Sequence, residues 1–396
     1  MQGIGVHCFA GGFTIGMKKA LPVVGQLEIH NFGTKTCEAH GTKFMNSSRW
    51  EEWDDYRSDW KDCSFCYGNP RCNSFSSYSA GGSKDVRGPF AKCTSDIWDL
   101  CKFGVDKKLE VIAFESVQQC YSVGKDLLRI LIDTLFAPNS YRIAHLFVNT
   151  AAEGNAQKRR RYFFVAYKNN RNFNVIVPTL PKQSLTVEDA IGPLANEITN
   201  EGRVCGPHSE YDINTSNAIP KSDKDMIPCL KEGEDYHRFA RKRLDELKRV
   251  SRFHYDKWLL RTSELPFSLH CPTRVRRNHA SPTICSTSHH LVHYKQDRFL
   301  TVGEIATLMG WPKGFIPIGN DPIAQIGKGV VPATGKWLGE QIKLYLENHW
   351  GDFDEEFKYE SGKRRFIERR FSKNEKPLEK VFHLTQYVQP FEWEKL

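Results

Sequence analysis

The sequence predicts an α/β fold in which helices cover both faces of a mostly parallel sheet. Two observations support this prediction. The apolar run Gly5–Phe9 leads into Ala10-Gly11-Gly12 and is followed by helical spacing over Phe13–Ala20. The segment Leu109–Phe114 is a nearly continuous apolar run, as expected of a central parallel strand that is buried on both faces. A chain of 396 residues can form two domains, of which this sheet would make the larger.

The composition is that of an ordinary globular protein, with 40% hydrophobic and 26% charged residues. No apolar run reaches the length of a membrane span, and because a strand is predicted close to Met1 we expect no signal peptide. The 12 cysteines are scattered, so we expect reduced thiols in a cytoplasm. Cys63-x-x-Cys66 lacks a second pair at zinc spacing; buried thiols explain it better, and no metal is expected. The net charge of +9 is compatible with a nucleic-acid partner.

The glycine turn after Gly5–Phe9 is typical of nucleotide-binding sheets, because glycines let the backbone approach a ligand. Sixteen residues beyond Gly12, Glu28 ends the apolar run Leu21–Leu27. An acid at the tip of the second strand can accept hydrogen bonds from both hydroxyls of a ribose. The alternative, a glycine turn and an unrelated surface glutamate, explains these two features about equally well.

A third strand with its loop is predicted within Met45–Trp60, and a fourth strand at Cys63–Tyr67. The fourth strand leads into Gly68-Asn69-Pro70-Arg71-Cys72. A cysteine in a loop held by proline and glycine is well placed to present a thiolate above a sheet. Most cysteines, however, are small buried hydrophobes. Glycine, serine and lysine between residues 79 and 87 predict a mobile loop.

The alternation of helices and strands continues to about residue 168. The predicted elements are a helix at Ile97–Phe103, the strand Leu109–Phe114 ending at Glu115, a helix at Val123–Leu135, and strands at His145–Val148 and Tyr162–Tyr167. The basic run 157–161, Gln-Lys-Arg-Arg-Arg, directly precedes the last strand. Such a run is usually a solvated face, but here the strand would bring alternate arginines to the rim of the sheet.

The alternation stops at about residue 169, which predicts a different domain. One clear helix, Tyr236–Leu260, carries nine lysines and arginines between residues 238 and 261 against three acids, with one apolar side. This helix can follow phosphates or can equally be an ordinary solvated helix. Further helices are predicted from Leu300–Glu304 and over Thr334–Asn348. The expected boundaries are therefore 1–168, 169–297, a return to the first domain at 298–350, and an extension at 351–396.

Six sequence motifs, in this order, resemble those of the DNA (cytosine-5) methyltransferase family. They are Ala10-Gly11-Gly12-Phe13 with Glu28, Gly68-Asn69-Pro70-Arg71-Cys72 with Phe75-Ser76, Glu115-Ser116-Val117, Gln157-x-Arg159-x-Arg161, Ser281-Pro282-Thr283-Ile284 with Arg298 and Leu300-Thr301-x-x-Glu304, and Gln325-x-Gly327 with Val330. The resemblance covers about residues 4–168 and 274–345, and a variable segment lies in the gap where the family has one.

The resemblance implies a Rossmann-like, S-adenosylmethionine-dependent methyltransferase sheet with a smaller DNA-recognition domain. It implies that the Cys72 thiolate adds to C6 of cytosine, Glu115 shares a proton with N3, Arg161 holds O2, and Arg159 shapes the pocket. The cytosine would flip out of the duplex, with residues 77–90 as a lid and 170–280 as the reader of DNA. The residues expected to bind the cofactor are His7, Phe9, Ala10, Gly11, Gly12, Phe13, Glu28, Pro70, Arg71, Lys328, Gly329 and Val330.

Five positions depart from the family pattern. His7 replaces a phenylalanine that packs on the cofactor adenine, Phe9 a glycine, Arg71 the second proline of the nucleophile loop, and Ser116 and Lys328 replace asparagines. Four of these would lie near the cofactor or the transferred carbon, whereas Cys72, Glu115 and the arginines are intact. An active enzyme with an altered donor pocket is therefore favoured over a silent DNA-binding relative.

Lys328 suggests which donor would suit such a pocket. Like charges about 5 Å apart repel by roughly 3 kcal/mol at an effective dielectric of about 20, so a lysine beside the sulfonium methyl would weaken binding of S-adenosylmethionine. Carboxy-S-adenosylmethionine would instead form an ion pair, with Arg71 as a second cation, and would give 5-carboxymethylcytosine. Alternatively, Lys328 points toward the carboxylate of the cofactor's own amino acid or into solvent.

The expected partner is double-stranded DNA, and we expect a monomer without a membrane partner. The expected location is the cytoplasm of a bacterium or a phage-infected cell, as part of restriction–modification or of phage DNA modification. An RNA-modifying branch of the family is the other enzymatic option. Its Cys-Phe-Thr signature does not occur in this chain.

Overall fold

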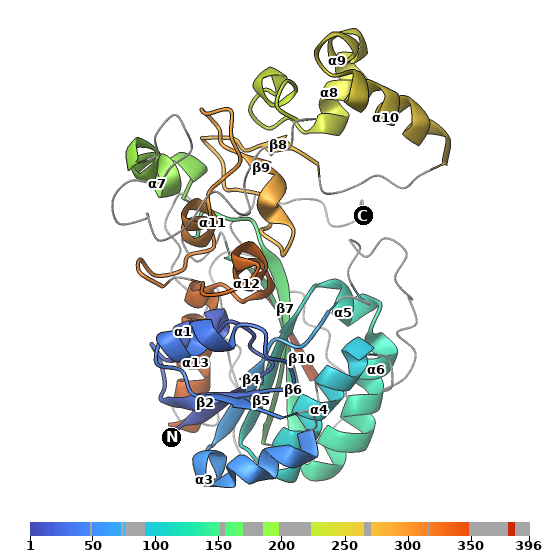
Figure 1. Cartoon of the computed structure of the whole chain (residues 1–396). Coiled ribbons are helices and arrows are strands. Elements are labelled where there is room, and N and C mark those ends of the chain that lie inside the picture. The colour runs from blue at the N-terminus through green and yellow to red at the C-terminus, as the bar shows by residue number, and fades with distance from the viewer. Residues whose placement is uncertain are drawn as a thin grey trace, which may run out of the picture. The chain divides into compact units, whose positions relative to one another are not determined.

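The computed structural model describes residues 1–47, 50–72, 75, 92–150, 155–168, 185–197, 223–264, 271–315, 317–347 and 379–384. The chain divides into two compact units (Figure 1). Unit 1 comprises Met1–Glu153, Arg160–Lys182 and Gly329–Leu396, and unit 2 comprises Gly154–Arg159 and Gln183–Lys328. The chain thus returns to unit 1 at Gly329, later than the residue 298 expected from the sequence. Within the described ranges, no helix combines the length and hydropathy that crossing a membrane requires.

Unit 1 is built on an eight-stranded sheet with the order β10-β6-β7-β5-β4-β1-β2-β3. The strands are β1 (Gly3–Val6), β2 (Val23–Glu28), β3 (Phe44–Asn46), β4 (Phe65–Gly68), β5 (Val111–Ser116), β6 (Tyr141–Asn149), β7 (Arg160–Lys168) and β10 (Glu379–Leu384). Only β7 runs antiparallel to its neighbours, β5 and β6. The predicted α/β fold with a mostly parallel sheet is confirmed. β10, which lies in the predicted extension, adds a parallel strand beside β6.

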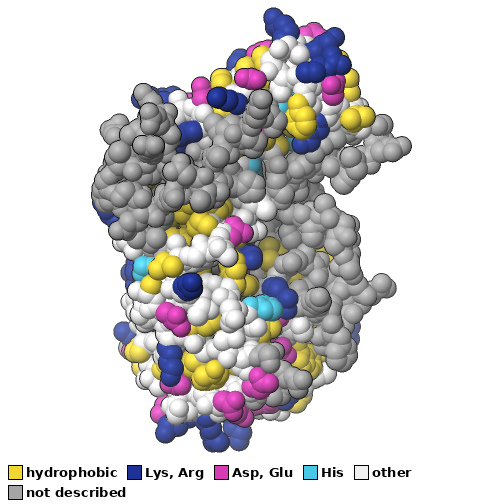
Figure 2. All heavy atoms as spheres, viewed as in Figure 1, with side chains coloured by type: hydrophobic (Ala, Val, Ile, Leu, Met, Phe, Trp, Pro, Cys, Tyr) yellow, Lys and Arg dark blue, Asp and Glu magenta, His cyan; other side chains and the backbone are white. Residues whose placement is uncertain are grey.

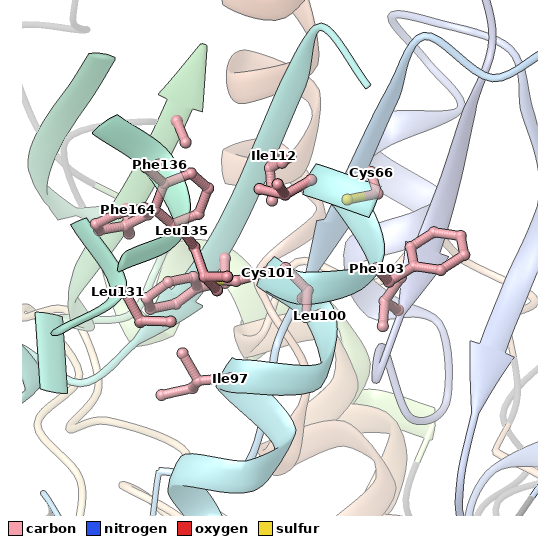
Figure 3. Packing of buried hydrophobic residues seen from close by; sticks show 14 of the residues in the cluster. Cys66, Ile97, Leu100, Cys101, Phe103, Ile112, Leu131, Leu135, Phe136 and Phe164 are labelled. Carbon is pink, nitrogen blue, oxygen red and sulfur yellow. The ribbon is translucent and has the colours of Figure 1, made fainter. Parts of the chain in front are cut away.

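Helices cover both faces of this sheet, as predicted (Figure 1). The helical segments of unit 1 are α1 (Gly12–Met17), α2 (Thr34–Ala39), η1 (Trp50–Tyr56), α3 (Arg57–Trp60), α4 (Lys92–Asp106), α5 (Gln119–Ser122), α6 (Lys125–Leu131), η2 (Ile132–Phe136), η3 (Ala137–Asn139) and α13 (Pro332–Leu346). On one face, Leu100 and Phe103 of α4 belong to a buried cluster with Cys66 and Ile112 of the sheet (Figure 3). Fully burying each large apolar side chain contributes about 1.5–3 kcal/mol.

The other face of the sheet is covered by α1 and α13. Alternate strand residues point to this side, so Tyr67 and Phe163 pack with Phe13 of α1 and Trp337 of α13. The two helices approach closely at Gly16, where a Cβ would lie 2.0 Å from the carbonyl oxygen of Pro332. A side chain at this position would separate α1 from α13. The predicted last core helix, α13, therefore packs tightly on α1, the helix that follows the glycine turn.

A third strand with its loop was predicted within Met45–Trp60, and the strand lies at the start of this segment, at Phe44–Asn46. The predicted loop is wrong, because η1 and α3 make up most of the rest of the segment. The segment is helical because Trp53 and Trp60 turn into the core, where both pack edge-on against Phe103 of α4.

Unit 2 contains short elements around its own core. They are α7 (Val187–Ile191), η5 (Gly192–Glu197), η6 (Ile227–Cys229), α8 (Tyr236–Lys242), α9 (Leu244–Val250), α10 (Arg252–Glu264), β8 (Thr273–Arg274), η7 (Ser288–His290), β9 (Leu291–Val292), α11 (Val302–Leu308) and α12 (Pro322–Lys328). The core joins Tyr236 and Phe239 of α8 to Leu247 and Val292. Arg274 is buried and donates to the backbone carbonyls of Ile227, Leu230 and His293.

The single helix predicted over Tyr236–Leu260 is wrong, because the chain breaks at two residues. Arg243 (φ −139°, ψ 49°) and Ser251 (φ −150°, ψ 93°) leave helical geometry. The Ser251 hydroxyl hydrogen-bonds His254 Nδ1, and the Tyr236 hydroxyl donates to the backbone carbonyl of His254. These contacts fold α8, α9 and α10 onto one another. Figure 2 shows lysine and arginine side chains gathered over them, with hydrophobic side chains between.

Candidate active site

The loop after β1 lies at the carboxyl edge of the sheet, where parallel sheets bind their ligands. Its backbone is left-handed at three alternate residues, with φ of 55° at His7, 53° at Phe9 and 84° at Gly11. Only the last of these suits its residue; left-handed geometry costs other residues about 1–2 kcal/mol each. Phe9, which replaces a glycine of the family, therefore keeps the left-handed backbone that favours glycine. Contacts with neighbouring residues must offset the cost of this conformation.

Glu28 holds this loop from the end of β2. Its Oε1 accepts the backbone N–H groups of Cys8 at 2.5 Å and Phe9 at 3.1 Å. Burial raises the pKa of Glu28 well above its usual range, although these two donors act in the opposite direction. Gln26 completes the support, since its Nε2 donates to the carbonyl of Phe9 and to Glu28 Oε1, each at 3.1 Å. Oε1 of Glu28 thus accepts hydrogen bonds from the protein itself, so Oε2 would be the oxygen that makes the predicted contact with a ribose.

His7 is buried against Trp53, with ring centroids 5.6 Å apart. Burial lowers the pKa of His7 to about 4, so the imidazole is neutral near pH 7. Nε2 of His7 and Nε1 of Trp53 are both buried without a hydrogen-bond partner among the described residues. Sequence reasoning did not single out Trp53, because one tryptophan within an acidic segment carries no motif.

The cysteine loop follows β4 and is fixed by an ion pair. Arg71 donates to Asp96 of α4 through both Nε (2.5 Å, to Oδ2) and Nη2 (2.6 Å, to Oδ1). Asp96 is 1% exposed, so this bidentate contact fastens the loop next to Cys72. Arg71 was predicted to be a second cation beside the transferred group, but its charge is balanced by Asp96.

Cys72 is half-buried, unlike the two cysteines of the preceding strand region. Burial raises the pKa of Cys63 to about 12 and raises that of Cys66 further, so both remain thiols near pH 7. Cys72 is therefore the cysteine best placed among these three to react as a thiolate. The predicted lid, residues 77–90, lies outside the described residues.

Glu115 is held by an ion pair and a hydrogen bond at the carboxyl end of β5. Arg161 Nε lies 2.7 Å from Glu115 Oε1, and Asn69 Nδ2 donates to Oε2 across 2.6 Å. The acid is 1% exposed. Arg161 reaches Glu115 because of the strand direction. β7 runs antiparallel to β5, so the first residues of β7 lie beside the last residues of β5, and Tyr162 is opposite Ser116. Sequence reasoning identified Glu115 and Arg161 but missed Asn69.

Arg159 lies in unit 2, where its buried guanidinium donates to backbone carbonyls. Its Nη1 reaches the oxygen of Ile284 at 2.6 Å, and both Nη atoms lie 3.4 Å from that of Gly327. Gln157 supports the same segment, since its Oε1 accepts the N–H of Ile284 at 2.7 Å. These contacts hold together three segments that are distant in the sequence, which suits a positioning role.

The predicted residues of the last motif fall on both sides of the division between units. Lys328 is the exposed last residue of α12 in unit 2. Desolvation lowers the pKa of its ammonium group, and the charge of Asp321 opposes this shift. Val330 belongs to unit 1 and is buried in the cluster that contains Phe13.

Comparisons with known proteins agree with this arrangement. Residues 1–344 match the model of the C-5 cytosine-specific DNA methylase family. The chain is 25% identical over 245 residues to the type II methyltransferase M.AplI of Arthrospira platensis, covering 60% of this chain and 58% of that protein. It is 22% identical over 282 residues to the type II methyltransferase M1.HphI of Haemophilus parahaemolyticus, covering 69% and 67%. The match with M.AplI thus spans less than two thirds of that relative.

Solved structures show the same fold. A prophage-encoded E. coli protein assigned as a DNA modification methyltransferase has a TM-score of 0.57 at 17% identity, covering 88% of this chain and 99% of that chain. The Entamoeba histolytica methyltransferase EhMeth has a TM-score of 0.55 at 13% identity, covering 88% and 98%.

Proposed function

Because the chain belongs to the C-5 cytosine-specific DNA methylase family, we propose that it transfers a methyl or carboxymethyl group to C5 of cytosine in double-stranded DNA, with Cys72 as nucleophile. The observation that carries this proposal is the placement of Glu115 between Arg161 and Asn69. A buried acid that an ion pair and a hydrogen bond hold at the carboxyl edge of the sheet can bind the N3 edge of a pyrimidine. Such a base must leave the duplex to reach it.

The residues of unit 1 fit S-adenosylmethionine as the cofactor. Gly11 adopts a left-handed conformation, and a Cβ there would lie 3.3 Å from Gln26 Oε1 and from Cys37 Sγ, so this tight turn requires glycine. The unpartnered nitrogens of His7, in the loop after β1, and of Trp53, in η1, belong to rings 5.6 Å apart and offer polar contacts to a bound ring. We assign cofactor binding to this loop, to Glu28 and to Pro70. When bound, S-adenosylmethionine supplies the methyl group that C5 accepts.

The chain's own residues supply the remaining steps. C5 of cytosine is a poor nucleophile until the Cys72 sulfur bonds to C6 and the electron pair of the C5–C6 double bond moves to C5. Glu115 shares a proton with N3 and so stabilises the resulting enamine. Arg161, which lies against Glu115, binds O2 in this proposal. After transfer, loss of the C5 proton and departure of the Cys72 thiolate restore the aromatic ring.

An assay with radiolabelled donor tests this proposal. We expect incorporation into duplex DNA, none into tRNA, and none with Cys72→Ala. Incorporation into tRNA alone would favour the RNA-modifying branch. Binding to DNA without incorporation from S-adenosylmethionine or carboxy-S-adenosylmethionine would identify a silent relative.

The basic surface of α8–α10 is our candidate for binding the DNA backbone. We propose that the protein acts as a monomer in the cytoplasm of a bacterium or phage-infected cell.

The identity of the donor is a second proposal, carried by Lys328. This lysine stands where the family has asparagine, and with Arg71 paired to Asp96 it is the cation that we assign to a donor carboxylate. Carboxy-S-adenosylmethionine would then give 5-carboxymethylcytosine. Nucleoside mass spectrometry of DNA incubated with each donor distinguishes the two products. Efficient methylation without carboxymethylation, unchanged in Lys328→Asn, would refute this assignment, whereas a switch toward methylation in that variant would support it.

A further inference from the structure

Asn69 is a buried amide that uses only one of its two ends. It follows Gly68, the last residue of β4, and is 4% exposed. Its Nδ2 donates to Glu115 Oε2 at 2.6 Å, while its Oδ1 is buried with no hydrogen-bond partner in the described part of the chain. Buried polar atoms are almost always paired in folded proteins, and exceptions concentrate where a ligand completes the pairing.

The orientation of this amide follows from its neighbours. Arg161 Nε lies 2.7 Å from Glu115 Oε1 as an ion pair without hydrogen-bond geometry, and Oε2 is the oxygen that accepts from Asn69. An amide oxygen turned toward Oε2 would place two acceptors together, so Nδ2 must face Glu115 and Oδ1 is the unused end. The position is set by strand register, since Gly68 pairs with Phe114 and the next residues along the strands are Asn69 and Glu115.

Ser116 does not provide an equivalent group. It occupies the position at which the resembling family has asparagine, and its Oγ is also buried without a hydrogen-bond partner among the described residues, but serine has no amide that could both donate to Glu115 and accept from a base. In this chain the amide beside Glu115 therefore comes from the residue after β4 and not from β5.

We propose that Asn69 Oδ1 accepts a hydrogen bond from the 4-amino group of the target cytosine while Nδ2 holds Glu115 for N3. This inference rests on the proposed function. N3 and the 4-amino group are adjacent on one edge of cytosine, so an amide bonded to the acid at N3 is next to the amine. Thymine and uracil carry an acceptor at this position, which would face Oδ1 unpaired. Asn69 thus selects cytosine as well as positioning Glu115.

Removing the 4-amino group from the substrate tests this contact. Duplexes carry either 5-fluorocytosine or 5-fluoro-2-pyrimidinone at the target position; both retain fluorine at C5, so the Cys72 adduct accumulates, and they differ only in the amine. With Asn69→Ala, the single-turnover rate of adduct formation should fall about 10- to 100-fold on 5-fluorocytosine. On the base without the amine, the fold-decrease in this rate should be smaller by a factor of at least about five.

A second variant separates the two roles of the side chain. Asn69→Asp keeps an acceptor for the amine but loses the donor to Glu115. Both adduct rates should therefore fall, while the preference for the amine-bearing base persists. Loss of this preference in Asn69→Asp, or equal rate losses on both bases in Asn69→Ala, would overturn the contact with the amine.

Asn139→Ala is the matched control. The Asn139 amide donates to the carbonyl of Leu135, and it lies just before β6, at the opposite end of the sheet from Glu115. Its adduct rates on both bases should equal those of the unmodified protein. If the unmodified protein forms no Cys72 adduct and transfers no group to cytosine, the proposed function fails and the inference fails with it. If the unmodified protein does react, but Asn69→Ala leaves its preference for the amine-bearing base unchanged, the inference alone fails.

Discussion

Replacing Arg161 by alanine would leave the buried carboxylate of Glu115 without the guanidinium that lies 2.7 Å from Oε1. At this distance and an effective dielectric of about 20, the Coulomb attraction is roughly 6 kcal/mol. Desolvation of both groups offsets part of it, since their side chains are only 13% and 2% exposed. Breaking such a buried pair typically costs about 3–5 kcal/mol. Because Asn69 still donates to Glu115, we expect the lower end, about 3 kcal/mol of the free energy of unfolding.

A double-mutant cycle measured by urea unfolding tests this value. Glu115→Gln should cost only about 1–2 kcal/mol, because a neutral amide can still accept from Arg161. Once the carboxylate is gone, removing Arg161 is less harmful, so the double variant should cost about 3 kcal/mol and reveal about 1–2 kcal/mol of coupling. Costs that add within about 0.5 kcal/mol would refute the coupling of this pair.

Arg129→Ala provides the matched control for an arginine in an ion pair. Arg129 lies 3.5 Å from Asp133 with side chains 68% and 41% exposed. Solvent screens such pairs, so its loss should change the free energy of unfolding by no more than about 0.5 kcal/mol. A comparable loss in Arg129→Ala and Arg161→Ala would mean that the burial of the Glu115 pair is energetically unimportant.

Four further outcomes are expected. Cys72→Ala should abolish transfer and Cys72→Ser nearly so, whereas Cys63→Ala should retain it in the labelled-donor assay; the reverse pattern would contradict the assignment of the nucleophile. Glu115→Gln should lower turnover about a hundredfold or more, with little change in DNA affinity by titration; equal losses would indicate a binding role only. His7 has a folded pKa of about 4 against about 6.5 when unfolded, so the unfolded chain binds its proton first as pH falls. Its contribution to stability, complete above about pH 6.5, should therefore be lost toward pH 4, by about 3 kcal/mol, and His7→Phe should flatten this part of the urea-unfolding profile. Val381→Pro should remove a backbone donor from β10 and lower the thermal unfolding midpoint, unless pairing with β6 contributes no stability.

The sheet could be predicted because its signals are local. The glycine turn before Phe13 and the continuous apolar run at Leu109–Phe114 each specify an element within a few residues. The helix over Tyr236–Leu260 was predicted as continuous because its composition favours helix throughout. The break at Ser251 depends on contacts with His254 that the apolar pattern does not reveal.

The candidate site could be predicted only in part, for the same reason. Glu115 and Arg161 lie at the ends of strands whose apolar pattern is clear, so their place at the rim of the sheet followed from the sequence. Arg159 is only two residues away, but its partners Ile284 and Gly327 lie 125 and 168 residues further along the chain. Asn69 has no local pattern at all, because its role depends on the register between β4 and β5.

The parallel pairing of β10 with β6 has a consequence for how the protein is made. Glu379 lies opposite Ile143, and all of unit 2 is encoded between the two strands. At about 5–20 residues per second, a ribosome needs roughly 12–50 seconds to synthesise the intervening chain. Throughout that time the outer edge of β6 has no strand to pair with, although its nine residues are all buried in the finished protein. An interruption of synthesis in this interval would release a chain with an open apolar edge, a form prone to aggregation and to capture by chaperones.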